Sequence, residues 1–150
     1  MSNGLLGNNK IVQVGIIVRD IEKTATEYAE FFGIEKSGAM LTDPIEKAET
    51  EYKGKPSEAR AKLAFMDFGS VQVELIEPDE HPSTWREFLD EHGEGIHHVA
   101  FFIKGMKEKV MTLTGKGFAV DQTGEYTGGR YAYINTREKL KTMIELLEND

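Results

Sequence analysis

Cysteine is absent from the 150-residue chain, so disulfide bonds, thiolate metal sites and cysteine nucleophiles are excluded. Proline is scarce, with 4 residues against 15 glycines, and the apolar content of 39% is typical of a folded globular domain. No apolar run reaches the roughly 18 residues that a membrane-spanning helix needs, and the first residues lack the basic and apolar regions of a signal peptide. We therefore expect a cytoplasmic protein without a membrane partner.

Positive charge is also in deficit. Lys and Arg number 18 against 26 Asp and Glu, which gives a formal net charge of -8. Such a chain is repelled at long range by phosphate backbones. We therefore expect no nucleic-acid partner, and any metal chemistry falls to His, Asp, Glu and Gln side chains.

The sequence contains an internal repeat. Four blocks of the N-terminal half, namely a strand, a helix start and two further strands, recur in the same order in the C-terminal half. Residues 12–23 align with 97–108, 64–67 with 132–135, and 73–77 with 144–148. The repeat indicates two related modules.

Each half is predicted to contain a strand, a helix and a run of further strands. Residues 11–18 are rich in β-branched side chains, which favours a strand. After Asp20, which is a suitable helix N-cap, apolar residues recur at three- and four-residue spacing until Gly33 ends the helix. Further strands are predicted at 38–42, 61–68, 71–77, 118–123, 130–135 and 142–148, with a second helix from Met106 to about Gly115.

The predicted fold class is therefore α+β, with two βαβββ modules whose sheets are mixed. We expect a single domain in which the helical linker carries three apolar side chains, Trp85, Phe88 and Leu89, that pack onto the sheets. The expected parts are a flexible N-terminus at 1–10, a first module at 11–80, the linker at 81–95 and a second module at 96–150.

Strand alternation singles out four polar side chains. Gln13 lies on the face opposite to Val12 and Val14, and His98 has the matching position in the second module. Glu74 and Glu145 are likewise repeat mates in the last strand of each module. By the same alternation, His97 is predicted to point away from His98.

These four residues need a common partner if they are buried. A buried carboxylate costs several kcal/mol unless it is paired, hydrogen-bonded or bound to a cation. Taken singly, each residue is more often a solvated strand residue, but one divalent cation satisfies all four. Three oxygen donors and one nitrogen suit Zn²⁺, Ni²⁺, Co²⁺ or Mn²⁺, whereas non-haem iron oxygenases use two histidines and one carboxylate.

The motifs around these residues resemble those of the vicinal oxygen chelate superfamily, which includes glyoxalase I, methylmalonyl-CoA epimerase, extradiol dioxygenases and bleomycin-resistance proteins. The matching segments are residues 12–18, 73–78, 93–101 and 143–147. The resemblance implies curved sheets that form a cavity around one metal ion, with Gln13, Glu74, His98 and Glu145 as ligands. The ligand types are those of glyoxalase I, whereas the segment Gly-Ile-His-His-Val-Ala-Phe is closer to the epimerases.

The resemblance implies a metal-dependent lyase or isomerase that moves a proton next to a carbonyl through a metal-bound enediolate. The substrate is then a thiol hemithioacetal, as for lactoylglutathione lyase, or an acyl thioester, as for methylmalonyl-CoA epimerase. Glu145 is the expected proton carrier. The alternative is a small-molecule-binding protein of the resistance type, with the same fold and no catalysis.

Two further expectations concern the surface. Arg130 follows Gly128 and Gly129, and it either presents its guanidinium to a substrate carboxylate or phosphate or lies on the surface after a turn. Modules of this size leave sheet edges and apolar helix faces uncovered. We therefore expect a homodimer, which is the most frequent closed assembly.

Overall fold

The computed structural model describes residues 4–150 and has an α+β fold built on one ten-stranded sheet. Residues 1–3, part of the expected flexible N-terminus, lie outside the described residues, and residues 4–12 contain no helix or strand. The strands are β1 (Gln13–Ile17), β2 (Met40–Leu41), β3 (Glu51–Tyr52), β4 (Lys55–Pro56), β5 (Ala61–Asp67), β6 (Gln72–Pro78), β7 (Gly95–Phe102), β8 (Ala119–Tyr126), β9 (Gly129–Asn135) and β10 (Met143–Asn149). The helices are α1 (Ile21–Phe32), α2 (Ile45–Ala48), α3 (Thr84–His92), α4 (Met106–Gly115) and α5 (Arg137–Leu140).

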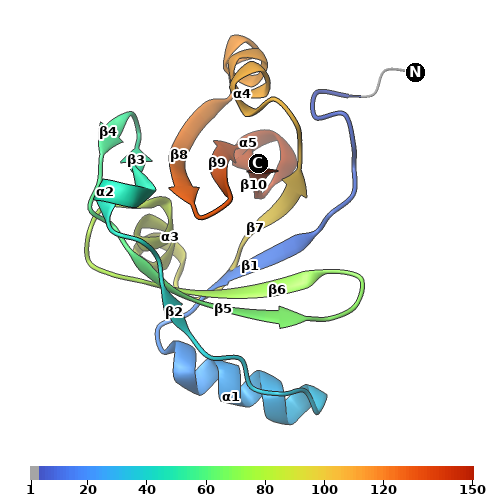
Figure 1. Ribbon diagram of the computed structural model, residues 1–150, viewed down its shortest axis with the longest axis vertical. Helices are drawn as coiled ribbons and strands as arrows, with labels where there is room; N and C mark the ends of the chain where they lie inside the picture. The colour runs from blue at the N-terminus through green and yellow to red at the C-terminus, as the bar shows by residue number, and fades with distance from the viewer. Residues whose placement is uncertain (1–3) are drawn as a thin grey trace.

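The strand order of the sheet reflects the sequence repeat. The strands follow one another as β2-β5-β6-β1-β7-β10-β9-β8-β3-β4, so that the first eight form two mirrored groups of four. Strand β1 pairs with β6 in parallel and β7 pairs with β10 in parallel, whereas the two groups join through the antiparallel pair β1–β7. The sheet curls strongly, most visibly where β7, β10, β9 and β8 wrap around the C-terminus (Figure 1). The predicted α+β class with a mixed, curved sheet is confirmed.

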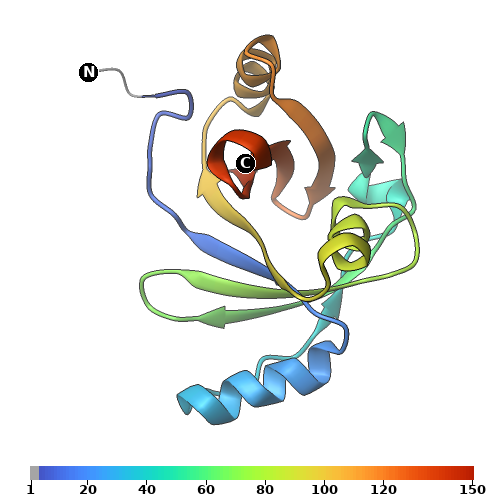
Figure 2. The same ribbon diagram turned by 180° about the vertical axis from the view of Figure 1, so that it is seen from behind.

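Helices cover the outer side of the curl. Helix α1 contacts β5 and β6, and α4 contacts β8 and β10, so the two lie at opposite ends of the molecule (Figure 2). As predicted, Asp20 caps α1 by accepting a hydrogen bond from the Lys23 N–H at 3.1 Å, and Gly33 ends it in the left-handed conformation with φ of 66°. Ile21 and Ala25 are the buried residues of this helix.

Helix α3 connects the two groups of strands and contacts β6, β1 and β7. The Ser83 hydroxyl caps it by accepting a hydrogen bond from the Arg86 N–H at 2.9 Å. The apolar face of α3 packs against Ile17 of β1 and Tyr133 of β9, and its buried residues include Trp85, Phe88 and Leu89. The helix therefore joins the cores of the two groups.

Strands β3 and β4 are not predicted from the sequence. They belong to the first half of the chain, yet β3 pairs with β8 at the edge of the second group. Strands of two residues are too short for alternation to show, so no sequence pattern reports them. Their effect is to tie the two halves together along a second edge.

No helix of the described chain is long and apolar enough to span a membrane.

Candidate metal centre

The four polar residues singled out by strand alternation converge on one face of the sheet. Cross-strand pairing aligns Glu74, Gly15 and His98 in one row across β6, β1 and β7. A second row, two residues further along the strands, contains Gln13 and Glu145 on either side of Ala100. Because side chains in such rows point to the same side of a sheet, all four polar groups face the same space.

Small residues leave room for this convergence. Gly15 lies between Glu74 and His98, and Ala100 lies between Gln13 and Glu145. The imidazole ring of His98 lies directly over Gly15, so that a Cβ atom there would stand 2.0 Å from Cε1 of the ring. Gly15 is therefore required by the close approach of the histidine.

The Nε2 atom of His98 is the centre of the cluster. It lies 3.0 Å from Oε1 of Gln13, 3.1 Å from Oε1 of Glu145 and 3.5 Å from Oε1 of Glu74. The amide nitrogen of Gln13 donates to Oε1 of Gln72 at 2.7 Å, which turns the Gln13 oxygen towards the histidine. Three oxygen atoms thus surround one nitrogen that can supply at most one proton.

The cluster is buried and contains two carboxyl groups. His98 is 0% exposed, Gln13 6%, Glu74 7% and Glu145 5%. Burial and the nearby carboxylate of Glu145 raise the pKa of Glu74 well above its ordinary value. Within residues 4–150, Oε1 of Glu74 is the one buried side-chain polar atom without a hydrogen-bond partner.

These observations fit a divalent cation. Glu74, His98 and Glu145 each offer a ligand atom within 4.8 Å of the others, and Gln13 adds a fourth. A cation would compensate both buried carboxylates and would give the unpartnered oxygen of Glu74 a ligand role. The donor set of three oxygens and one nitrogen suits the ions expected from the sequence.

The prediction that His97 points away from His98 is wrong. The cross-strand register shifts after Gly15, so that His97 is an extra residue in β7, as in a β-bulge. Both rings are consequently buried side by side, with 2.9 Å between their Nδ1 atoms. Nε2 of His97 lies 3.1 Å from the hydroxyl oxygen of Thr84, the first residue of α3.

This chain of contacts can set the tautomer of His98. Burial, His98 and Arg137 lower the pKa of His97 well below its ordinary value, so its imidazole is neutral. A His98 that binds a metal through Nε2 keeps its proton on Nδ1 and donates it to Nδ1 of His97. The Nε2–H group of His97 then donates to Thr84.

The cluster opens onto a cavity of about 440 Å³. Gln13, Glu74 and Glu145 form part of its wall, together with aromatic side chains that include Trp85, Tyr131 and Tyr133. The indole N–H of Trp85 donates to the hydroxyl of Tyr133 at 3.0 Å, which fixes both rings.

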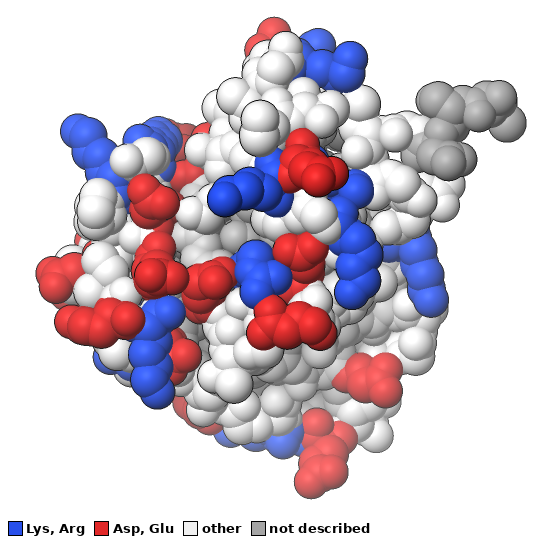
Figure 3. Space-filling model, turned by 45° about the horizontal axis from the view of Figure 1, so that its top comes forward, with Lys and Arg blue, Asp and Glu red and all other residues white. Residues whose placement is uncertain are grey.

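On the surface, acidic side chains gather on the side of the molecule that carries α2 and β3 (Figure 3).

Arg130 is not brought to the cluster. Its guanidinium forms ion pairs with Glu125 at 3.4 Å and Glu148 at 3.0 Å, and a further pair with Asp150. It does not line the cavity. The interpretation of Arg130 as a surface residue after a turn describes this position better than a substrate contact does.

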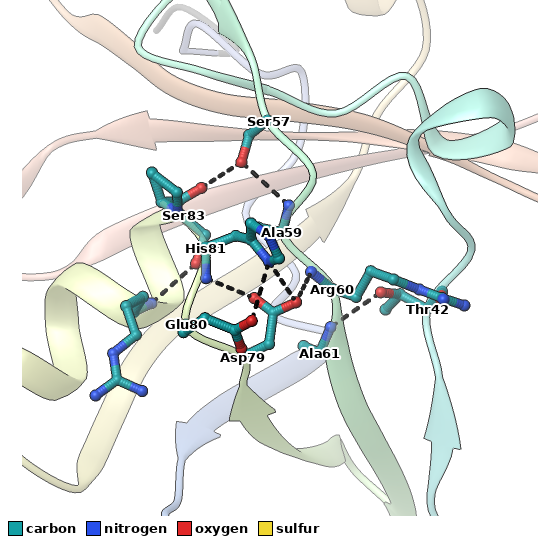
Figure 4. Close-up of polar contacts among 11 residues, drawn as sticks. Thr42, Ser57, Ala59, Arg60, Ala61, Asp79, Glu80, His81 and Ser83 are labelled. Atoms are coloured by element: carbon teal, nitrogen blue, oxygen red, sulfur yellow. Dashed lines mark hydrogen bonds and ion pairs between the residues drawn. The ribbon is translucent and has the colours of Figure 1, made fainter.

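A second group of acidic residues, Asp79 and Glu80 with His81, lies in the segment between β6 and α3 (Figure 4). The carboxylate of Asp79 already accepts hydrogen bonds from the N–H groups of Arg60 at 2.9 Å and His81 at 3.0 Å. It also contacts the His81 ring at 3.2 Å. The group is therefore a hydrogen-bonded turn that fixes the entry to α3.

Sequence reasoning missed the residues that position the cluster. Gln72 shares a strand face with Glu74 and orients Gln13, so alternation alone was a sufficient signal for it. The sequence does not indicate a positioning role for His97 or Thr84, because neither a β-bulge nor a contact between distant segments leaves a local sequence pattern.

Comparisons with known proteins agree with this architecture. The sequence profile of the glyoxalase/bleomycin resistance protein/dioxygenase superfamily matches residues 12–133. The uncharacterized protein YqjC of Bacillus subtilis (strain 168) is 28% identical over 143 residues, which cover 93% of this chain and 92% of YqjC.

Solved structures show the same fold. Methylmalonyl-CoA epimerase from Mycobacterium tuberculosis has a TM-score of 0.60 at 22% identity, covering 100% of this chain and 93% of the epimerase. A variant of the Streptomyces coelicolor epimerase in complex with 2-nitronate-propionyl-CoA has a TM-score of 0.61 at 19% identity, covering 94% and 97%. At these identities the likeness concerns the fold alone.

We expect Gly15→Ala to weaken Zn²⁺ binding by about tenfold or more, because the new methyl group displaces the His98 ring from the cluster. Competition with a chromophoric chelator measures the affinity. Gly38→Ala is the matched control, since a Cβ atom there meets nothing within 4 Å. Equal affinities of the two variants would show that the His98 position does not matter.

We also expect Thr84→Val to lower the affinity for Zn²⁺, by roughly tenfold, because the His97 Nε2–H loses its acceptor and the His98 ring is less firmly held. The same competition assay applies. Thr112→Val, an exposed site of the same residue type in α4, should bind like the parent protein. An unchanged affinity of Thr84→Val would remove Thr84 from the positioning role.

Proposed function

Because the chain belongs to the glyoxalase/bleomycin resistance protein/dioxygenase superfamily, as its motifs indicated, we propose that it is a metal-dependent lyase or isomerase that moves a proton next to a carbonyl group. The observation that supports this proposal best is the buried cluster around Nε2 of His98. Its unpartnered Glu74 oxygen and its position in the cavity wall suit a site where a cation meets a small molecule.

In this proposal Gln13, Glu74, His98 and Glu145 hold one divalent ion, such as Zn²⁺, Ni²⁺, Co²⁺ or Mn²⁺. When bound, the ion supplies Lewis acidity that stabilises negative charge developing on a substrate carbonyl oxygen. The neutral ligands Gln13 and His98 leave two carboxylate charges to balance the ion. The site as a whole is then close to electrically neutral.

Glu145 is the proposed proton carrier. Its carboxylate lines the cavity and is 5% exposed, so a proton on it exchanges with a bound substrate in preference to bulk water. It accepts the proton from the carbon next to the carbonyl and returns it to the neighbouring carbon, whereas inversion at the same carbon would need a second proton donor on the opposite face. A carboxylate suits both steps because it is an acceptor when ionised and a donor when protonated.

The proposed substrate is a thiol hemithioacetal or an acyl thioester. The ligand types support the first, which is the substrate class of glyoxalase I. The similarity of the fold to methylmalonyl-CoA epimerases supports the second. Both classes have an acidic C–H group beside a carbonyl, so one cluster serves either.

We expect Glu145→Gln to reduce solvent-proton exchange at the carbon beside the carbonyl by at least about a hundredfold, because the amide cannot accept the proton. Deuterium incorporation from D₂O is followed by NMR with methylglyoxal hemithioacetals and with methylmalonyl-CoA, while bound metal is determined in parallel. Glu138→Gln, at an exposed carboxylate of α5, is the control. Full exchange by metal-loaded Glu145→Gln would assign the proton to another group.

The same exchange measurement on the parent protein distinguishes the proposed reaction from simple binding. Exchange into either substrate by protein loaded with one of the four ions supports the enzyme. If no exchange into either substrate is detected with the metal bound, the result would contradict the proton-transfer function and favour a binding protein of the same fold.

We propose further that the protein is a homodimer. Apolar side chains are exposed on α1 and on the edge strand β2, with Phe31 84% and Met40 56% exposed. Association would remove such surface from water. Sedimentation velocity should then give twice the chain mass of 16.9 kDa, and a monomer at micromolar concentrations would contradict the proposal.

A further inference from the structure

We infer that the cavity selects a substrate whose body carries no negative charge. The expected ligand is a compact, uncharged or cationic molecule, largely apolar or aromatic, with two adjacent oxygen atoms for the cation. The need for adjacent oxygens depends on the proposed function. The statement about charge depends only on the wall of the cavity.

All charged side chains that line the cavity are acidic. Besides Glu74 and Glu145 of the cluster, Asp43 and Glu125 contribute to the wall, whereas no Lys, Arg or His of the described chain does. Asp43 is half-buried and has no ion-pair partner within residues 4–150. With Glu74 and Glu145 compensated by the proposed cation and Glu125 paired with Arg130, Asp43 supplies the uncompensated negative charge of the wall, which repels anions.

Two arginines that contact residues of the cavity wall are already engaged. Arg130 is paired with Glu125, Glu148 and Asp150, so its charge is compensated before any substrate arrives. The Nε–H of Arg60 donates to the backbone carbonyl of Thr42 at 2.8 Å (Figure 4), and Arg60 does not line the cavity. Neither guanidinium is placed to receive a substrate phosphate or carboxylate from inside the cavity.

The remaining wall suits an apolar or aromatic group. Aromatic side chains contribute from both halves of the molecule, among them Phe65 of β5, Phe102 of β7 and Tyr131 of β9. Aromatic faces attract flat rings and also cations. Glu125 is 40% exposed and therefore lies where the cavity meets solvent.

This charge pattern discriminates between the proposed substrate classes. The phosphates of a coenzyme A ester and the carboxylates of a peptide thiol would find no basic side chain among the lining residues and would be repelled by Asp43. An aromatic or aliphatic aldehyde adduct of an uncharged or cationic thiol would not. The structure therefore favours a hemithioacetal-like substrate without carboxylate or phosphate.

The test uses three aryl hydroxamates that present the same adjacent oxygens. They are three benzohydroxamic acids that differ in the para substituent: an uncharged carbamoyl group, a carboxylate of nearly the same shape, or a cationic trimethylammonio group. Trp85 is the single tryptophan of the chain and lines the cavity, so quenching of its fluorescence reports occupancy. Titrations use the full chain loaded with Zn²⁺ at low ionic strength.

We expect the uncharged and cationic probes to bind at least tenfold more tightly than the anion, with a gap that narrows as salt screens the repulsion. In Asp43→Asn the anion should gain several-fold in affinity, while the carbamoyl probe should not change. Glu30→Gln on α1 alters the net charge equally but outside the cavity, and it should behave as the parent protein.

An anion that binds as tightly as the carbamoyl probe would overturn the inference, even if proton exchange is observed. The predicted order of affinities without proton exchange would leave the inference standing and would contradict the proposed reaction. Failure of all three probes to bind the Zn²⁺-loaded protein would overturn both the charge inference and the proposed reaction.

Discussion

Two carboxyl groups and an imidazole are buried close together at the centre of the curled sheet, and the strand order of the chain brings them there. Glu74 and Glu145 come from strands β6 and β10, which lie on opposite sides of the antiparallel pair β1–β7. Both carboxylates are almost entirely buried, and no Lys or Arg side chain of the described residues forms an ion pair with either. The surrounding fold holds the two carboxylates together, and the proposed cation would compensate their charge.

Rigidity comes from the register of four neighbouring strands. Gln13 and His98 are related by the sequence repeat, as are Glu74 and Glu145, so each module contributes one neutral and one acidic donor. The small residues Gly15 and Ala100 lie between these donors in the two cross-strand rows. The duplicated architecture thus builds a site that neither module contains alone.

Much of this could be predicted from the sequence because alternation in strands is a local signal. The faces of Gln13 and Glu74 follow directly from it, and the repeat transfers the assignment to the second half. The position of His97 could not be predicted, since a single-residue bulge inverts the face of a side chain without a mark in the local composition. Pairing of β3 with β8 and the ion pairs of Arg130 are likewise set by segments far apart in the sequence.

The distance along the chain between Gln13 and Glu145 has a consequence for biosynthesis. Gln13 lies on β1 and Glu145 on β10, which are the first and last strands along the chain. A nascent chain therefore cannot form the complete cluster until β10 has left the ribosome. An ion that requires all four donors would therefore stabilise the finished fold and none of its earlier stages. Retention of the ion would then distinguish a completely folded chain from a partly folded one.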